Sequence, residues 1–122
     1  MKPETERWVQ LAHGDMQMAE AAWERELYSP CLFHCQQAIE KALKAGLVEA
    51  GAEVPKTHDL VGLAGRLKLN LDAEQKDFLG RLTEQYIPTR YGDVWVEYPR
   101  DVAENYFEAA KGMYAWLLQQ LK

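Results

Sequence analysis

Apolar residues recur at every third or fourth position along most of the chain, which is the spacing of an amphipathic α-helix. The first stripe predicts a helix over residues 3–25, and Pro3 fits its first turn because a proline lacks the N–H that would be unpaired there. The second stripe predicts a helix over residues 30–50, capped at its start by Ser29 and ended by a left-handed Gly51. Its inward positions are Leu32, Cys35, Ile39, Ala42, Leu43, Gly46 and Leu47.

Three more helices are predicted in the second half of the chain. Thr57 is expected to cap a short helix that ends within residues 68–70. Asp72 is expected to cap a helix over residues 73–86, which Pro88 terminates because a proline removes a backbone donor. The two shortest of the predicted elements therefore lie between the second helix and the last one.

The last predicted helix has Asp101 as its N-cap. Its expected inward residues are Val102, Tyr106, Ala109, Ala110, Met113, Leu117 and Leu121. We interpret residues 89–99 as an ordered loop, since a strand at Val94-Trp95-Val96 would have no second strand to pair with. The chain is thus predicted to be all-α, an antiparallel up-and-down bundle of four long helices plus one short connecting helix, in a single domain over residues 1–122.

Composition and charge narrow the function classes. The 122 residues are 48% hydrophobic and 27% charged, and 19 acidic against 14 basic residues give a formal net charge of −5. Proteins that grip duplex DNA carry the opposite sign, so we expect no duplex binding. No apolar run reaches the roughly 20 residues of a membrane span, the N-terminus lacks a signal-peptide core, and two cysteines make no disulfide framework. We therefore expect a cytoplasmic protein without membrane contact.

Aromatic residues are numerous for a small bundle, with 4 Trp, 6 Tyr and 3 Phe. We expect some of them at a subunit interface, and hence a homodimer. Four of the chemically interesting side chains lie in or beside the predicted loop: Arg90, Tyr91, Asp93 and Tyr98. A guanidinium suits a bidentate grip on phosphate, and an aromatic ring can stack on a base. The alternative is a loop held together by an Arg90–Asp93 ion pair.

The polar face of the second helix is another candidate. Gln37, Glu40 and Lys41 follow an apolar run and could face a partner or a groove, although a solvated surface is the default interpretation of such residues. His58 follows Thr57 and is expected to help end the loop. Cys31, His34 and Cys35 could bind zinc together with His58 or His13, but we favour core cysteines and no metal site. A disulfide is not expected, because a continuous helix should point the two thiols apart.

Several segments together make the chain resemble the HEPN family (higher eukaryotes and prokaryotes nucleotide-binding domains), in particular its small stand-alone prokaryotic members. The most specific matches are a Gln-Gln-Ala-x-Glu-Lys-x-Leu-Lys run over residues 36–44, Thr-His-x-Leu over residues 57–60, and Arg-Tyr-x-Asp over residues 90–93. The resemblance covers nearly the whole chain. It implies a bundle of four or five helices, a homodimer with a cleft between protomers, and a minimal nucleotidyltransferase partner in a toxin–antitoxin pair.

Catalytic family members cleave RNA with an arginine followed, after four to six residues, by a histidine. Arg90 stands at the arginine position, but Trp95, Val96 and Glu97 occupy the places for the histidine. Metal-independent RNA cleavage needs a group that shuttles protons near neutral pH, and histidine suits that task. We therefore assign no catalytic residue and expect a module that binds a nucleotide or RNA and the nucleotidyltransferase, with no other cofactor.

The expected ligand-binding residues are Arg90, Tyr91, Asp93, Tyr98, Glu40, Lys41 and His58. Two alternatives belong to other classes. The chain could be an RNA endonuclease toxin with a displaced base, for which His58 or His34 would have to reach Arg90. It could also be a purely dimeric scaffold, which would hold no ligand.

Overall fold

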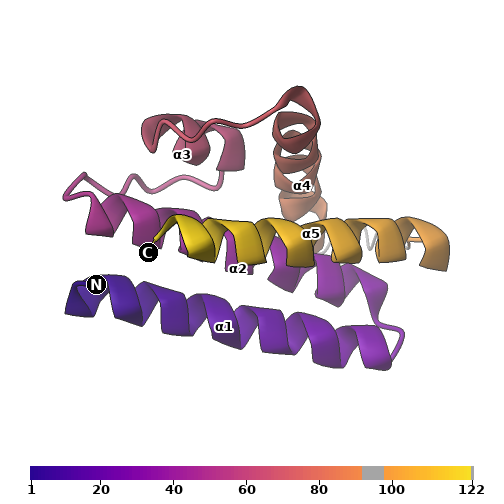
Figure 1. Cartoon of the computed structure of the whole chain (residues 1–122). Coiled ribbons are helices and arrows are strands. Elements are labelled where there is room, and N and C mark those ends of the chain that lie inside the picture. The colour runs from indigo at the N-terminus through magenta and orange to yellow at the C-terminus, as the bar shows by residue number, and fades with distance from the viewer. Residues whose placement is uncertain (92–97, 122) are drawn as a thin grey trace.

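The computed structural model describes residues 1–91 and 98–121, and the side chains of residues 1–84 and 98–121. This part of the chain is all-helical, which confirms the predicted fold class (Figure 1). Its helices are α1 (Pro3–Glu24), α2 (Tyr28–Glu49), α3 (Leu60–Arg66), α4 (Ala73–Tyr91) and α5 (Arg100–Gln120). Within the described residues, no helix has the length and apolarity that a bilayer crossing requires.

The helices α1, α2 and α5 lie side by side, and α4 runs across them (Figure 1). The N-terminus of α1 meets the end of α2, where Lys2 N donates to Glu49 Oε1 at 3.0 Å, so these two helices are antiparallel. By contrast, α5 begins next to the start of α2, where Arg100 Nη1 donates to the Tyr28 hydroxyl at 3.1 Å. The segment with α3 and α4 returns the chain to the end of the bundle where α2 begins, so α5 runs parallel to α2. The predicted arrangement, in which successive long helices alternate in direction, is therefore not the observed one.

Small residues hold α1 and α2 close together. Ala12, Ala19 and Ala38 are fully buried between these helices, and the predicted inward stripe of α2 is almost entirely buried. Cys31 and Cys35 lie in this core with free thiols. The expectation that the thiols point apart is wrong, because residues four apart share a helix face. Their interaction, together with burial, raises the pKa of Cys35, and the same interaction lowers the pKa of Cys31.

The starts of α3 and α2 depart from prediction. Asp59 rather than Thr57 caps α3, because its carboxylate accepts from Gly62 N at 3.1 Å. Helix α2 begins at Tyr28, so its N-cap is Leu27, which makes no side-chain capping hydrogen bond, and the predicted cap at Ser29 is wrong. The predicted cap at Asp72 is confirmed, and the left-handed Gly51 that follows α2 is also confirmed, with φ of +74°.

The C-terminal half contains two larger corrections. Helix α4 continues through Pro88 to Tyr91, so residues 89–91 belong to a helix and not to the predicted loop. A proline deletes one backbone donor, but the residues after it can keep helical dihedrals. Pro99, not Asp101, is the N-cap of α5. The rest of the predicted loop, residues 92–97, lies outside the described residues.

The inward face of α5 is rotated from the predicted one over its first half. Ala103, Phe107 and Tyr114 are buried, while Val102 and Ala109 are exposed. Ala110, Met113 and Leu117 are buried as predicted. The N-terminal half of α5 therefore has two apolar stripes, and only one of them faces α2.

Candidate functional site

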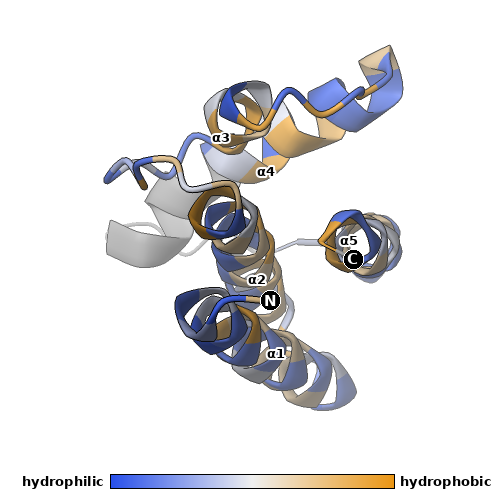
Figure 2. Cartoon of the chain, turned by 60° about the vertical axis from the view of Figure 1, so that its left-hand side comes forward, coloured by the Kyte–Doolittle hydropathy of each residue, from blue (hydrophilic) through white to orange (hydrophobic). Residues whose placement is uncertain are grey.

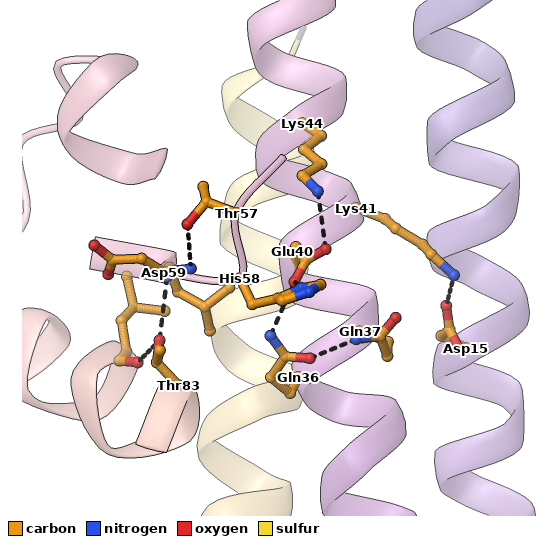
Figure 3. Close-up of polar contacts among 12 residues, drawn as sticks. Asp15, Gln36, Gln37, Glu40, Lys41, Lys44, Thr57, His58, Asp59 and Thr83 are labelled. Atoms are coloured by element: carbon orange, nitrogen blue, oxygen red, sulfur yellow. Dashed lines mark hydrogen bonds and ion pairs between the residues drawn. The ribbon is translucent and has the colours of Figure 1, made fainter. Parts of the chain in front are cut away.

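A band of polar side chains crosses the middle of α2 and reaches neighbours on both sides (Figure 3). We call it the α2 polar band. Its members on α2 are His34, Gln36, Gln37, Glu40, Lys41 and Lys44. Asp15 comes from α1, and His58 comes from the segment before α3. Gln36, Glu40 and Lys44 follow one another at i,i+4 spacing, so helical geometry places them on one face of α2.

The carboxylate of Glu40 is the centre of this band. Its side chain is only 5% exposed and accepts three hydrogen bonds. The Oε1 atom accepts from Gln36 Nε2 at 3.1 Å and from His58 Nδ1 at 2.8 Å, and Oε2 accepts from Lys44 Nζ at 3.0 Å. A buried carboxylate is costly unless it is paired and hydrogen-bonded in this way. The default interpretation of a solvated α2 face is therefore wrong at Glu40.

Lys44 is buried along with its partner. Its side chain is 10% exposed, and its ammonium lies 5.9 Å from the ring centroid of Trp8. Both the carboxylate and the ring stabilise a positive charge that water barely reaches. The ion pair is thus fixed inside the fold, and the neighbouring polar residues are arranged around it.

His58 reaches Glu40 from the segment that precedes α3. The hydroxyl of Thr57 accepts from Asp59 N at 3.2 Å, and Thr83 Oγ1 of α4 accepts from Leu60 N at 3.1 Å (Figure 3). These two contacts fix the backbone on both sides of the imidazole. Because an ionised carboxylate only accepts, Nδ1 of His58 carries the proton, and the ring orientation is set. The His58 side chain is 50% exposed, so the ring also faces the surface.

A second carboxylate has a similar set of partners on the other side of α2. Asp15 of α1 accepts from His34 Nδ1 at 2.9 Å through one oxygen and from Lys41 Nζ through the other. Asp15 is therefore a link between α1 and α2, and it holds a partly exposed imidazole and a partly exposed ammonium. Each carboxylate of the band thus binds one lysine and one histidine.

The charges of the band differ from those of the whole chain. Two carboxylates are matched by two lysines, so the band has no net charge with neutral histidines. The chain as a whole carries −5. An anionic ligand would therefore meet less repulsion here than over the average surface.

The structure brings together three of the predicted ligand-binding residues: Glu40, Lys41 and His58 all belong to the band (Figure 3). Tyr98 is half-buried at the start of α5, where burial raises the pKa of its phenol and nearby Tyr106 adds to the shift. Arg90 and Tyr91 lie in the last turn of α4, and their side chains are outside the described part of the structure. Asp93 lies outside it entirely.

The candidate zinc ligands do not converge. His34 is bound to Asp15, His58 to Glu40, and Nδ1 of His13 is hydrogen-bonded to the Tyr114 hydroxyl at 2.6 Å. Within the described ranges, no three side chains among His, Cys, Asp and Glu gather as metal ligands would. The nitrogen atoms of these histidines instead serve in hydrogen bonds between helices.

The predicted ligand-binding residues did not include Asp15, His34 and Lys44, although His34 was considered as a zinc ligand and as a displaced base. A signal was present for Lys44, because Gln36, Glu40 and Lys44 stand at i,i+4 spacing beside the apolar stripe of α2. That spacing predicts mutual contact but not burial. Burial comes from α1 and the segment before α3, which cover the face from opposite sides.

The fold and the band define a small all-α domain with a charged, histidine-bearing face on its central helix. A model of the HEPN domain matches residues 5–121, and the chain belongs to the HEPN family. It is similar to ST0689, an archaeal HEPN homologue, with 30% identity, 100% of both chains covered and a TM-score of 0.78. It is also similar to TT1696 from Thermus thermophilus, with 25% identity, 97% of this chain and 98% of that one covered, and a TM-score of 0.82. No protein of curated function matches the chain.

Proposed function

We propose that this HEPN domain binds a nucleotide, and that it is the partner of a minimal nucleotidyltransferase in a toxin–antitoxin-like pair. The observation that carries the nucleotide-binding proposal is the His58 imidazole, which the buried Glu40 carboxylate holds at 2.8 Å while half of the side chain stays exposed. A ring fixed in this way loses little freedom when it contacts a ligand, so it contributes more to affinity than a mobile side chain would.

Phosphate is the part of a nucleotide that this band suits best. Lys41 and His58 can both donate to phosphate oxygens, and the carboxylates of Asp15 and Glu40 are already occupied by lysine. Repulsion between a phosphate and these carboxylates is therefore reduced. In this proposal Glu40 is a positioning residue, which acts on the ligand through His58.

The register of α4 supports including Arg90 in the same site. Thr83 contacts the backbone of Leu60, two residues after His58. Arg90 follows Thr83 by seven residues, so the two positions share one face of α4 about 10 Å apart. In this proposal Arg90 binds the phosphates, and Tyr91 and Tyr98 stack on the base. Asp93 accepts a hydrogen bond from a ribose hydroxyl, because a carboxylate is an acceptor.

Isothermal titration with ATP, GTP and the corresponding monophosphates tests this proposal. We expect the wild type to bind at least one of them, and Arg90→Ala and His58→Gln each to weaken it by about 1.5–3 kcal/mol, the loss typical of a hydrogen bond to a charged group. His13→Gln is the matched control, since His13 lies on a different face and contacts Tyr114. Failure of the folded wild type to bind any nucleotide would refute the binding proposal.

The partnership is tested separately, by co-expressing the chain with the nucleotidyltransferase encoded next to it. We expect a stable complex on gel filtration. A nucleotidyltransferase that elutes entirely alone would remove the toxin–antitoxin part of the proposal and leave nucleotide binding untouched.

One observation favours a second function, RNA cleavage with His58 as a displaced base. A carboxylate bound to Nδ1 orients an imidazole and fixes its tautomer, as in hydrolases that use a carboxylate–histidine pair. His58 would take the proton of a ribose 2′-hydroxyl as its oxygen attacks the adjacent phosphorus. The bond from phosphorus to the 5′-oxygen of the next nucleotide then breaks, which leaves a 2′,3′-cyclic phosphate, and the departing 5′-oxygen takes a proton from water. His34 on Asp15 has the same arrangement but is less exposed. RNA cleavage in the presence of EDTA that disappears in His58→Gln and persists in His34→Gln would establish this function.

We also propose that the chain forms a homodimer. Leu11 and Met18 are exposed and lie on one face of α1, two turns apart, so the outer side of α1 offers an apolar surface. Light scattering at micromolar concentration tests this. A dimer is expected for the wild type and a monomer for the double variant Leu11→Glu, Met18→Glu, whereas a monomeric wild type would contradict the proposal.

A further inference from the structure

A shallow groove separates α4 from the first half of α5, on a face that the α2 polar band does not reach. Its cavity volume is about 370 Å³, and it is lined by Glu74, Asp77, Phe78, Arg81, Val102, Asn105, Tyr106 and Ala109. The two helices diverge here because α4 runs across the others while α5 lies along α2 (Figure 2). The groove is therefore a consequence of the crossing angle and not of a missing side chain.

The floor of this groove is apolar. Phe78 of α4 and Tyr106 of α5 stack at a tilt with ring centroids 6.1 Å apart, and Val102 stands beside them with 37% of its surface exposed. Val102, Tyr106 and Ala109 make up the second apolar stripe of α5, the one that the protein core leaves uncovered. Spacings of four and three residues along a helix present such a stripe as a continuous surface.

The rim of the groove is acidic. Asp77 is paired with Arg81 at 2.9 Å, and both residues line the groove. Further along α5, Glu108 is paired with Lys111, also at 2.9 Å. Glu74 remains on the α4 wall, and Asp101 precedes the lining residue Val102 on α5; the described residues give neither carboxylate a cationic partner. A second copy of this face would set carboxylates against carboxylates, so charge disfavours a two-fold contact through the groove.

We propose that this groove binds a basic amphipathic helix of a partner protein. The apolar side of such a helix fills the floor over Phe78, Val102 and Tyr106, and its lysines or arginines meet the rim carboxylates. The lining residues span about two turns on each wall, which is enough for two or three apolar anchors. We expect a weak complex, with a dissociation constant of about micromolar order, because transient encounters use interfaces of small size, and the exposed charges make its affinity depend on salt.

A pair of designed peptides tests the proposal with the intact protein. The first is a fluorescent helix of about 18 residues with leucines at i, i+3, i+4 and i+7 and lysines elsewhere on its surface, and the second carries glutamate in place of every lysine. We expect fluorescence anisotropy to show micromolar binding of the lysine peptide, weakened by added salt, and no binding of the glutamate peptide. Equal binding of both peptides, or binding of neither, would overturn the proposal.

Two valines of equal exposure locate the binding surface. Val102 lies in the groove and Val61 at the start of α3, and each is 37% exposed. Val102→Gln is expected to weaken the lysine peptide about tenfold, and Glu74→Gln to weaken it and reduce its salt dependence, whereas Val61→Gln leaves it unchanged. Equal effects of the two valine variants would refute the assignment. So would a Val102→Gln variant that converts a wild-type dimer into a monomer, because the groove would then be a contact between copies.

Discussion

Replacing Glu40 by glutamine tests how the α2 polar band is held together. Glutamine keeps the shape of the side chain, and its carbonyl oxygen can still accept from Gln36 and His58. It cannot neutralise Lys44, whose ammonium lies 3.0 Å from Oε2 with only 10% of its side chain exposed. Breaking a buried ion pair by removing one charge costs about 3–5 kcal/mol. Because two of the three hydrogen bonds survive, we expect a loss near the lower end, about 3 kcal/mol in the free energy of unfolding.

Urea denaturation followed by far-UV circular dichroism measures this loss, and two further variants interpret it. Asp77→Asn removes the acid of an exposed i,i+4 pair, 62% and 63% exposed, and should cost about 0.5 kcal/mol or less. Adding Lys44→Met to Glu40→Gln removes the unpaired charge and should restore at least about 1.5 kcal/mol. A loss below about 1 kcal/mol for Glu40→Gln, or no recovery in the double variant, would refute a buried and interdependent pair.

Three other variants test separate parts of the fold. Burial raises the pKa of Tyr114 to about 12 from its ordinary 10.0. The folded state therefore favours the neutral phenol, and this contribution to the free energy of unfolding is complete below about pH 10 and is lost between about pH 10 and 12. Denaturation titrations should show wild type losing about 2 kcal/mol more than Tyr114→Phe over that range, and parallel curves would disprove the assignment. Thr5 donates to Glu49 at 2.9 Å from a fully buried position, so Thr5→Val should lower the free energy of unfolding by about 1 kcal/mol, and an unchanged midpoint would count against this bond. Gly51 has φ of +74°, so Gly51→Ala should cost about 1 kcal/mol by the same assay, and a stabilised variant would contradict the left-handed cap.

The sequence predicted the helical class because the periodicity of α1 and α2 is long and regular. The buried stripe of α2 and the caps at Asp72 and Gly51 follow from rules that involve neighbouring residues only. The direction of α5 relative to α2 does not follow from such rules, because it depends on the end of the molecule to which α3 and α4 bring the chain. The continuation of α4 through Pro88 is likewise decided by what packs around the helix, which a local rule about proline does not include.

Three members of the candidate site could be predicted from the sequence, but the geometry of the site could not. Glu40, Lys41 and His58 could be selected as polar residues next to an apolar stripe and a short helix. Their contacts join α2 to segments 18 and 26 residues away in sequence, and no periodicity specifies such pairings. The same limit explains α5, where two apolar stripes stand side by side and only the tertiary packing decides which of them enters the core.

The most direct measurement of nucleotide binding through the band is an NMR titration of the imidazole nitrogens. The chain has three histidines, and each has a different partner: Tyr114 for His13, Asp15 for His34 and Glu40 for His58. On addition of the nucleotide identified by calorimetry, the account predicts saturable shifts of the His58 ring nitrogens and none at His13. Shifts confined to His13, or a bound nucleotide that leaves His58 unmoved, would contradict it.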